Sequence, residues 1–183
     1  MKESEDTVME KLLIAVDIQK DFVDGSLGTA EACEMLPFAE EKIRNFDGTV
    51  IFTKDTHGED YLNTQEGRNL PVIHCIKDTE GWMLAGELEK FCADNNCRVY
   101  EKGTFGSTAL ASDIKALYEE GKIESVTFIG LCTDICVISN ALALKAFCPE
   151  LPICLDEKCC AGVTKEKHDA AVETMKSCQI KVE

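Results

Sequence analysis

The chain alternates short apolar runs with stretches in which apolar residues recur at helical spacing. Six apolar runs predict strands at residues 12–18, 49–55, 98–103, 125–130, 151–155 and 179–183. Helices are predicted over residues 30–45, 83–93, 108–120, 134–147 and 164–177, whereas residues 56–80 carry no regular pattern. Because such an alternation is typical of βαβ units, the sequence predicts an α/β fold with a parallel sheet.

The same pattern continues from end to end without a visible boundary. No repeat, low-complexity tract or Pro/Gly/Ser-rich linker divides the 183 residues, which suffice for one hydrophobic core. We therefore expect a single domain over residues 1–183. Right-handed crossovers place the C-terminal ends of parallel strands on one edge of the sheet, and ligands bind there in open α/β sheets. Reactive side chains at strand ends are accordingly the first candidates for a site.

Charge and hydropathy argue against several classes of partner. The net charge of −15 repels nucleic acid and anionic membrane surfaces. No apolar run approaches the roughly 20 residues that span a bilayer. The acidic first residues, MKESEDTVMEK, lack the basic start and apolar stretch of a signal peptide. We expect a cytoplasmic protein that binds neither nucleic acid nor membrane.

The eleven cysteines do not form a recognisable disulfide framework, because their number is odd and their spacing irregular. In a reducing compartment we expect most of them to be small buried residues. No role is assigned to Cys159 and Cys160, expected in a loop after the fifth strand, or to Cys92 and Cys97, which lack a second pair for zinc. His168, in a polar helical segment, is expected to be solvated. A catalytic cysteine must therefore be identified from its neighbours.

Three strand ends carry reactive groups. Asp17 ends the first strand, Lys102 ends the third, and a turn from Cys132 to Cys136 follows the fourth. Each has a plainer interpretation: Asp17 as a turn cap, Lys102 as a solvated lysine and Cys136 as an inert thiol. Together they place an acid/base group, a cation and a nucleophile at the sheet edge where pockets form.

A cysteine hydrolase needs these residue types. A helix N-terminus and a nearby ammonium both favour the thiolate of Cys136, which attacks carbonyl groups far better than a thiol does. Asp17 can take the thiol proton and later return it to a leaving amine. Backbone N–H groups of the turn before Cys136 can hold the oxyanion of a tetrahedral intermediate.

Three sequence blocks resemble the isochorismatase-like hydrolases, a family that includes the nicotinamidases. They are DIQKDF from Asp17, KGTFGS from Lys102 and GLCTDICV from Gly130. The blocks follow the family's order across essentially the whole chain. The resemblance implies a three-layer α/β/α, Rossmann-like fold whose six-stranded parallel sheet has the order 3-2-1-4-5-6. Related folds commonly self-associate, so a homo-oligomer is possible.

The resemblance also implies roles for individual residues. Asp17, Lys102 and Cys136 correspond to the catalytic triad of the family. A cis peptide bond between Leu131 and Cys132 is implied as well, turning the N–H groups of Cys132 and Cys136 into an oxyanion hole.

A second cluster follows the second strand. Asp55 and His57 stand at its end, and His74 follows the irregular segment, so two of the chain's three histidines fall beside the presumed pocket. Carboxylate and imidazole are suitable ligands for zinc, iron or manganese. The alternative is that both histidines are hydrogen-bonded loop residues. The resemblance favours a metal, because nicotinamidases place an Asp-x-His pair and a later histidine around a metal that binds the ring nitrogen of the substrate.

The fourth metal ligand departs from the three-histidine pattern of the family. Many nicotinamidases supply a histidine or glutamate between the two histidines, and this sequence has no histidine between residues 57 and 74. Glu66 is the first choice, with Glu59 and Asp60 as weaker candidates. The predicted cofactor is one divalent transition metal, with zinc as the first choice and iron or manganese as alternatives.

Aromatic residues supply the apolar walls that small-molecule pockets favour. Phe22, which follows Asp17 by one turn in the first block, is the first choice for stacking on a planar ring, followed by Trp82 and Phe105. Each could instead be an ordinary core residue. Tyr61, in the irregular segment, could form part of a lid.

These features predict a cysteine amidohydrolase that acts on a small amide, with nicotinamide as the leading substrate and nicotinic acid and ammonia as products. Another carboxamide, a carbamoyl compound or isochorismate is the alternative within the family. The metal distinguishes these possibilities, because isochorismatases proper lack it. A metal- or redox-binding protein without hydrolase activity is the alternative from another class. It predicts that Cys136 is no more reactive than the other cysteines.

Overall fold

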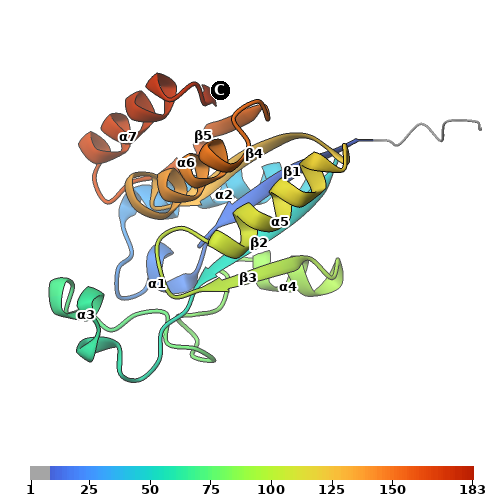
Figure 1. Ribbon diagram of the computed structural model, residues 1–183. Helices are drawn as coiled ribbons and strands as arrows, with labels where there is room; N and C mark the ends of the chain where they lie inside the picture. Colours follow the sequence, from blue (N-terminus) through green and yellow to red (C-terminus); the bar gives the residue numbers. More distant parts are fainter. Residues whose placement is uncertain (1–8) are drawn as a thin grey trace, which may run out of the picture.

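The computed structural model describes residues 9–183 as a sheet with helices on either side (Figure 1). Most of the acidic start of the chain, on which the expectation of no signal peptide rested, lies in residues 1–8, outside the described residues. Within residues 9–183, no helix is both long enough and apolar enough to cross a membrane.

All six strands are parallel, and their order in the sheet is β3-β2-β1-β4-β5-β6, which confirms the fold that the resemblance implied. The strands are β1 Glu10–Val16, β2 Thr49–Asp55, β3 Arg98–Lys102, β4 Ile123–Leu131, β5 Ile153–Ala161 and β6 Lys181–Val182. Strand β1 is central, between β2 and β4. Its last five residues are buried, as expected for a parallel strand covered on both faces.

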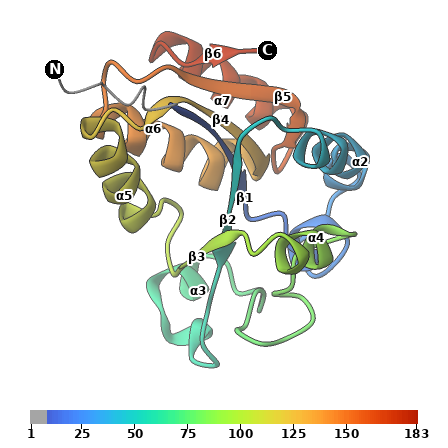
Figure 2. The ribbon, with the colours of Figure 1, turned by 90° about the vertical axis from the view of Figure 1, so that its right-hand side faces the viewer.

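Helices cover both faces of the sheet, with α5 and α6 on one side and α2 and α4 on the other (Figure 2). The helices are α1 Lys20–Val23, α2 Ala30–Arg44, α3 Gln65–Asn69, α4 Leu88–Asp94, α5 Thr108–Glu119, α6 Ile138–Phe147 and α7 Lys165–Ser177, with two short turns, η1 Tyr61–Asn63 and η2 Thr133–Val137. Hydroxyl side chains cap the start of four helices by accepting an otherwise unpaired backbone N–H. The caps are Thr29, Thr64, Ser107 and Thr164.

The helix predicted over residues 83–93 is shorter than expected, because it begins only at Leu88. Before it, Leu84 pairs with Gln19 in an antiparallel bridge, and the Ala85 N–H donates to the Ile18 carbonyl at 2.9 Å. These contacts hold residues 84–85 against the end of β1 and away from helical geometry. The segment 56–80 also differs, since it contains η1 and α3.

Strand β5 is longer than the predicted strand at residues 151–155 and runs to Ala161. The expectation that Cys159 and Cys160 lie in a loop is therefore wrong. Both are buried in the strand, and Cys160 pairs with Gly130 of β4 after a register shift. Three charged residues in the middle of β5 interrupt its apolar pattern. The apolar pattern alone therefore did not predict the second half of the strand.

Gly130 allows β4 to pass close to β1. A Cβ atom at this position would lie 2.1 Å from the Val16 carbonyl oxygen, and the residue has a φ of 120°, which side chains disfavour. The close approach brings the end of β4 against the residue that precedes Asp17.

Candidate active site

The carboxyl ends of β1, β2, β3 and β4 meet at one edge of the sheet. The register pairs Val16 of β1 with Thr53 and Gly130 on its two neighbours, and it pairs Asp55 of β2 with Lys102 of β3. Residues that directly follow β1 and β4 therefore lie beside the ends of β2 and β3. The three blocks identified in the sequence converge at this edge.

The structure brings Asp17, Lys102 and Cys136 into contact. The Lys102 Nζ lies 2.6 Å from the Asp17 Oδ2 and 3.6 Å from the Cys136 Sγ. Exposed fractions are 0% for Asp17, 6% for Lys102 and 5% for Cys136. In such a buried position, the ammonium interacts with the carboxylate and the sulfur more strongly than it would in water.

Thr53 fixes the orientation of the Asp17 carboxylate. Its hydroxyl donates to the Asp17 Oδ1 at 2.6 Å and accepts from the Asp17 N–H at 3.2 Å. Asp17 has a φ of 48°, in the left-handed region, and such strain is frequent at functional sites. Its Oδ2, despite the nearby Lys102 ammonium, is the one buried side-chain oxygen or nitrogen in residues 9–183 without a hydrogen bond of normal geometry. This oxygen is available to accept a proton.

The three side chains shift one another's proton affinity. Burial raises the pKa of Asp17 against the opposing effect of the Lys102 ammonium. Burial also raises the pKa of the Cys136 thiol, and the Asp17 carboxylate adds to this effect. Burial disfavours the charge of Lys102, but the combined effect of Asp17, Cys136 and Asp55 outweighs burial, so the pKa of Lys102 lies above its usual value. Contrary to the expectation from the helix N-terminus, the pKa of the Cys136 thiol therefore lies above its usual value.

The turn that carries Cys136 is the π-helical segment η2 between β4 and α6, a type of irregularity often found at functional sites. The peptide bond between Leu131 and Cys132 is cis, as the resemblance implied. The Cys132 carbonyl accepts the N–H groups of Ile135 at 3.0 Å and Val137 at 3.1 Å. These bonds close the turn and place Cys136 directly before α6.

Asn140 connects this turn to the loop after β3, and the sequence analysis did not identify it. Its Nδ2 donates to the carbonyl oxygens of Cys136 at 2.8 Å and Phe105 at 3.1 Å. Its Oδ1 accepts the Ser107 N–H at 2.9 Å. A buried amide within the apolar segment ISNALAL was the available signal. Asn140 thus connects Cys136 to the loop that follows Lys102.

A second cluster, formed by Asp55, His57, Glu66 and His74, lies beside the first. One ligand atom from each of the four lies within 4.8 Å of the others. The Asp55 Oδ2 is 3.0 Å from the His57 Nε2 and 3.5 Å from the His74 Nε2. The Glu66 Oε1 is 3.7 Å from the His57 Nε2 and 3.9 Å from the His74 Nε2. The weaker candidates, Glu59 and Asp60, are exposed and do not belong to the cluster.

The cluster fits one divalent transition metal. Tetrahedral zinc with ligand distances of about 2.0–2.1 Å separates its donor atoms by roughly 3.3 Å, close to the separations seen here. The His74 Nδ1 donates to the Val72 carbonyl oxygen at 2.8 Å, so its Nε2 is the ring nitrogen that faces the cluster. Loss of the Nε2 proton would free a lone pair for a metal. A carbonyl that fixes the tautomer in this way is characteristic of metal-binding histidines.

Asp55 belongs to both clusters. Its Oδ1 lies 3.7 Å from the Lys102 Nζ, while its Oδ2 faces His57 and His74. Burial raises the pKa of Asp55, but hydrogen bonds with the two histidines and the charge of Lys102 outweigh burial and lower it below its usual range. The carboxylate is therefore ionised, as a metal ligand must be.

Gln19 and Asp21 of the first block hold the surrounding backbone, a function that the sequence analysis did not assign. The buried Gln19 side chain accepts the Asp55 N–H at 2.7 Å and donates to the Asp55 carbonyl at 2.9 Å and the Trp82 carbonyl at 3.0 Å. The Asp21 Oδ2 accepts the Cys75 N–H at 2.7 Å. Both residues thereby fix segments that carry the proposed metal ligands.

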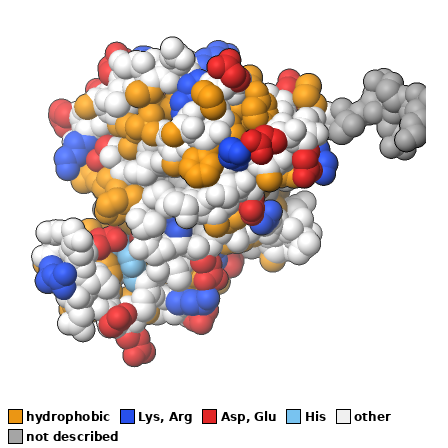
Figure 3. Space-filling view, viewed as in Figure 1, with side chains coloured by type: hydrophobic (Ala, Val, Ile, Leu, Met, Phe, Trp, Pro, Cys, Tyr) orange, Lys and Arg blue, Asp and Glu red, His pale blue; other side chains and the backbone are white. Residues whose placement is uncertain are grey.

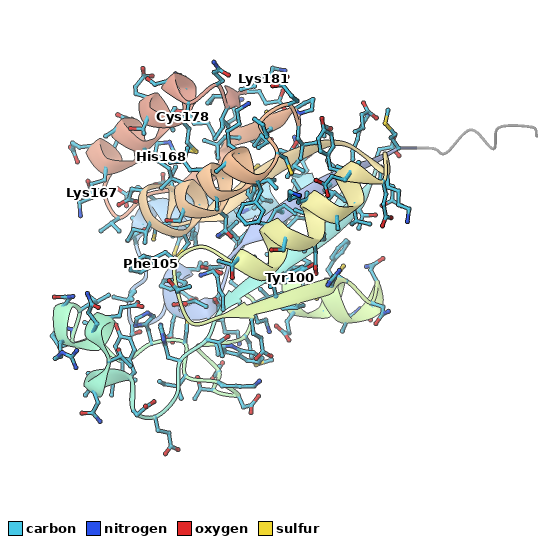
Figure 4. All side chains as sticks on the ribbon, viewed as in Figure 1. Tyr100, Phe105, Lys167, His168, Cys178 and Lys181 are labelled. Atoms are coloured by element: carbon cyan, nitrogen blue, oxygen red, sulfur yellow. The ribbon has the colours of Figure 1, made fainter. Side chains whose placement is uncertain are left out.

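A cavity of about 400 Å³ opens beside the metal cluster (Figure 3). It is lined by His57, Glu66 and Phe105, together with polar residues of the α3 segment and the loop after β3. Phe105 is 45% exposed and lies in that loop (Figure 4). The structure therefore places Phe105, one of the three predicted substrate-binding aromatics, at a cavity large enough for a small planar molecule.

Phe22, Trp82 and Tyr61 do not line this cavity. The Phe22 ring packs against His74 with 5.5 Å between centroids, so it adjoins the metal cluster. Trp82 is not among the residues that line the cavity: its ring lies under the Lys54 ammonium, 4.0 Å from the centroid, and its Nε1 donates to the Thr56 hydroxyl at 2.9 Å. Tyr61 is buried against His57, with 4.5 Å between the ring centroids.

The expectation that His168 is solvated is wrong. Its side chain, labelled in Figure 4, is only 13% exposed. Its Nδ1 lies 2.8 Å from the Thr133 Oγ1 in η2. The charged residues around it in the sequence suggested an exposed face. They could not reveal a partner 35 residues earlier in the chain.

Comparisons with known proteins agree with this architecture. The Isochorismatase domain profile matches residues 11–183. An isochorismatase family protein, PncA of Bacillus subtilis (strain 168), is 32% identical over 171 residues, which cover 87% of this chain and 91% of that protein. A nicotinamidase of Schizosaccharomyces pombe is 27% identical over 205 residues, covering 93% of this chain and 91% of that protein. The solved pyrazinamidase of Pyrococcus horikoshii in complex with zinc superposes with a TM-score of 0.78 at 27% identity, over 95% of this chain and 98% of that chain. The chain belongs to the isochorismatase family.

Proposed function

We propose that this protein is a nicotinamidase-like cysteine amidohydrolase that converts nicotinamide to nicotinic acid and ammonia through a thioester on Cys136. The observation that carries the proposal is the contact of Lys102 with both Asp17 and Cys136, next to a cluster of metal-ligand type. Membership of a hydrolase family and similarity to a nicotinamidase support action on the C–N bond of a small amide.

In the first half of the reaction, Asp17 takes the proton of the Cys136 thiol as sulfur bonds to the amide carbonyl carbon. Asp17 then returns that proton to nitrogen as the C–N bond breaks, releasing ammonia and leaving a thioester. The raised pKa of Asp17 suits an acid/base group that must both accept and donate a proton near neutral pH. The Lys102 ammonium stabilises the sulfur anion while it exists.

In the second half, a water molecule attacks the thioester carbonyl. Asp17 accepts a proton from the water, the C–S bond breaks, and Asp17 passes this proton to the sulfur, which regenerates the thiol and the carboxylate. During both attacks, the N–H groups of Cys132, just before η2, and of Cys136 within it would donate to the negative oxygen of the tetrahedral intermediate.

A divalent metal held by Asp55, His57, Glu66 and His74 would bind the pyridine nitrogen and so fix the ring. Phe105 in the cavity wall, and Phe22 beside His74, would supply apolar contact with the ring faces. These contacts would orient the carboxamide toward Cys136. An oriented substrate lowers the entropic part of the barrier.

Ammonia release from nicotinamide tests the proposal directly. We expect turnover by the wild-type protein and loss of at least about a thousandfold in the Cys136→Ala variant, because removal of a nucleophile leaves only residual catalysis. Cys33→Ala, which changes an exposed cysteine, is the matched control and should be fully active. Equal activity of Cys136→Ala and wild type would refute the mechanism.

A panel of other small carboxamides, carbamoyl compounds and isochorismate separates the proposed substrate from the alternatives within the family. The nicotinamidase assignment predicts that compounds with a ring nitrogen meta to the carboxamide are preferred over benzamide, and that a chelator removes this preference. Faster turnover of a substrate without any ring nitrogen would move the assignment to another branch.

A further inference from the structure

The corner between β5 and α7 contacts the turn that carries the nucleophile. The His168 Nδ1 on α7 lies 2.8 Å from the Thr133 Oγ1 of η2. The neighbouring Asp134 Oδ1 of η2 accepts the Val163 N–H of the corner at 2.9 Å. Two consecutive residues of η2 are thus held by one corner of the chain.

Gly162 allows the corner to pack closely against η2. A Cβ atom at Gly162 would lie 2.8 Å from the Asp134 Oδ1 and 2.9 Å from the backbone nitrogen of His168. Any side chain at residue 162 would therefore push the corner away from η2 or displace α7. A glycine at this point allows His168 to reach Thr133.

The contact between His168 and Thr133 involves the same turn that carries Cys136, the proposed nucleophile. Thr133 has no exposed surface, and its hydroxyl has His168 as its only hydrogen-bond partner within residues 9–183. It begins the same π-helical turn that contains Cys136, three residues later. On its other side, the His168 Nε2 lies 3.6 Å from the Glu157 Oε1, so the ring spans from η2 to β5.

We propose that His168 is a positioning residue of the active site: through Thr133 it fixes the η2 turn and thereby the sulfur of Cys136 relative to Asp17 and Lys102. The inference rests on the proposed function, because it assigns Cys136 as the nucleophile. His168 touches neither the cavity nor the three reacting side chains. Its replacement should accordingly change kcat and leave substrate binding intact.

The test compares His168→Leu, which removes the hydrogen bond at similar volume, with His168→Asn, whose amide can replace the Nδ1 contact. Thr133→Val removes the same hydrogen bond by replacing the Thr133 hydroxyl with a methyl group. Lys165→Ala, which breaks an exposed ion pair with Asp169 on the same helix, is the control. The measurements are kcat and KM for nicotinamide, the melting temperature, and the rate at which iodoacetamide alkylates Cys136, followed by peptide mass spectrometry.

We expect His168→Leu and Thr133→Val to lower kcat about ten- to a hundredfold, the range that a displacement of roughly 1 Å can produce. KM should stay within about twofold, alkylation of Cys136 should slow in parallel, and His168→Asn should recover most of the loss. The double variant should be no worse than the worse single variant, because both remove one interaction.

Two results would overturn the inference: native kcat and native Cys136 alkylation in His168→Leu, or a loss in His168→Asn equal to that in His168→Leu. The proposed function fails separately, if the wild-type protein releases no ammonia from nicotinamide. The alkylation rates of Cys136 would then still decide whether His168 positions the turn.

Discussion

At the scale of single residues, the proposed base depends on one hydroxyl group. Thr53 donates to the Asp17 Oδ1 at 2.6 Å from a fully buried position. This hydrogen bond favours the ionised carboxylate and lowers the pKa of Asp17, against the larger effect of burial, which raises it. The hydroxyl therefore favours the state of Asp17 that can accept the thiol proton.

Thr53→Val should reduce activity and shift its pH dependence. Asp17 must be ionised to act as a base, so activity is lost as pH falls through its pKa. Loss of the hydroxyl raises that pKa, and the acidic limb of kcat/KM moves to higher pH. A hydrogen bond to a charged group contributes about 1.5–3 kcal/mol, which corresponds to a fall in kcat/KM of about tenfold or more. Kinetics from pH 4 to 8 measure both effects.

Thr49→Val provides the control for this prediction. Thr49 begins the same strand, and its hydroxyl donates to the exposed Glu10 carboxylate at 2.9 Å, far from the site. Its profile should coincide with that of the wild type. An unshifted acidic limb in Thr53→Val would mean that Asp17 is not the group that titrates.

Glu66 is the candidate metal ligand for which the sequence left alternatives open. Because its carboxylate completes the cluster with Asp55, His57 and His74, Glu66→Gln should weaken zinc binding by at least about tenfold. Glu59→Gln, at an exposed position in the same segment, should bind zinc as the wild type does. Competition with a chromophoric chelator measures both affinities. Equal zinc affinity of the two variants would exclude Glu66 as a ligand.

The sequence could predict residues whose chemistry is visible locally. Asp17, Lys102 and Cys136 stand at strand ends and within family blocks, and the structure brings them together. Thr53 and Asn140 were missed because their contacts join segments more than thirty residues apart. A hydroxyl in an apolar strand or an amide in an apolar helix has no periodic pattern, so only the folded chain reveals its partner.

At the scale of elements, the close approach of β4 to β1 depends on Gly130. Gly130→Ala should destabilise the protein, because its Cβ atom would meet the Val16 carbonyl oxygen at 2.1 Å with φ in the left-handed region. Overpacking of this kind typically costs about 1–3 kcal/mol, and the backbone strain adds to it. Urea unfolding should show the loss as a lower midpoint.

A control at Gly121 separates the cost of steric overlap from the cost of the backbone conformation. It also has a positive φ, of 71°, but a Cβ atom there would meet nothing within 4 Å. Gly121→Ala therefore experiences only the conformational cost, which we expect to be about 1 kcal/mol. A midpoint for Gly130→Ala equal to that of Gly121→Ala would contradict the importance of the close approach.

Elements were predictable where their pattern was continuous. The helix at residues 30–45 and the strand at 49–55 are found within one residue of their predicted bounds, because their apolar spacing is unbroken. Strand β5 was underestimated because charged residues lie in its middle, and α4 was overestimated because tertiary pairing with Gln19 holds the residues before it. In both cases, contacts with distant segments override the local pattern.

At the scale of the whole molecule, the six-stranded order followed from the family resemblance, and the alternation of strands and helices alone predicted only a parallel sheet. The order has a chemical consequence. Because β1 is central, with β2 and β4 on its two sides, the segments that follow β1, β2 and β4 can all reach one point at the sheet edge. Lys102 enters from β3 beside Asp55. Asp17, Lys102, Cys136 and the candidate metal cluster therefore share one edge of the sheet.

The fold also determines which of the eleven cysteines react first. Cys33 is exposed, whereas Cys136 is buried and burial raises the pKa of its thiol. Under limiting iodoacetamide at neutral pH, we therefore expect Cys33 to be alkylated before Cys136, because the thiolate is the reactive form and access is required. This order, unlike ammonia release, does not separate a hydrolase from a metal- or redox-binding protein without hydrolase activity. Cys75 and Cys160, both buried with raised pKa values, should react only when urea unfolds the protein. Peptide mass spectrometry over a time course gives the order. If Cys136 is labelled before Cys33 in the folded protein, Asp17 and Lys102 activate the sulfur without substrate more strongly than burial suppresses it.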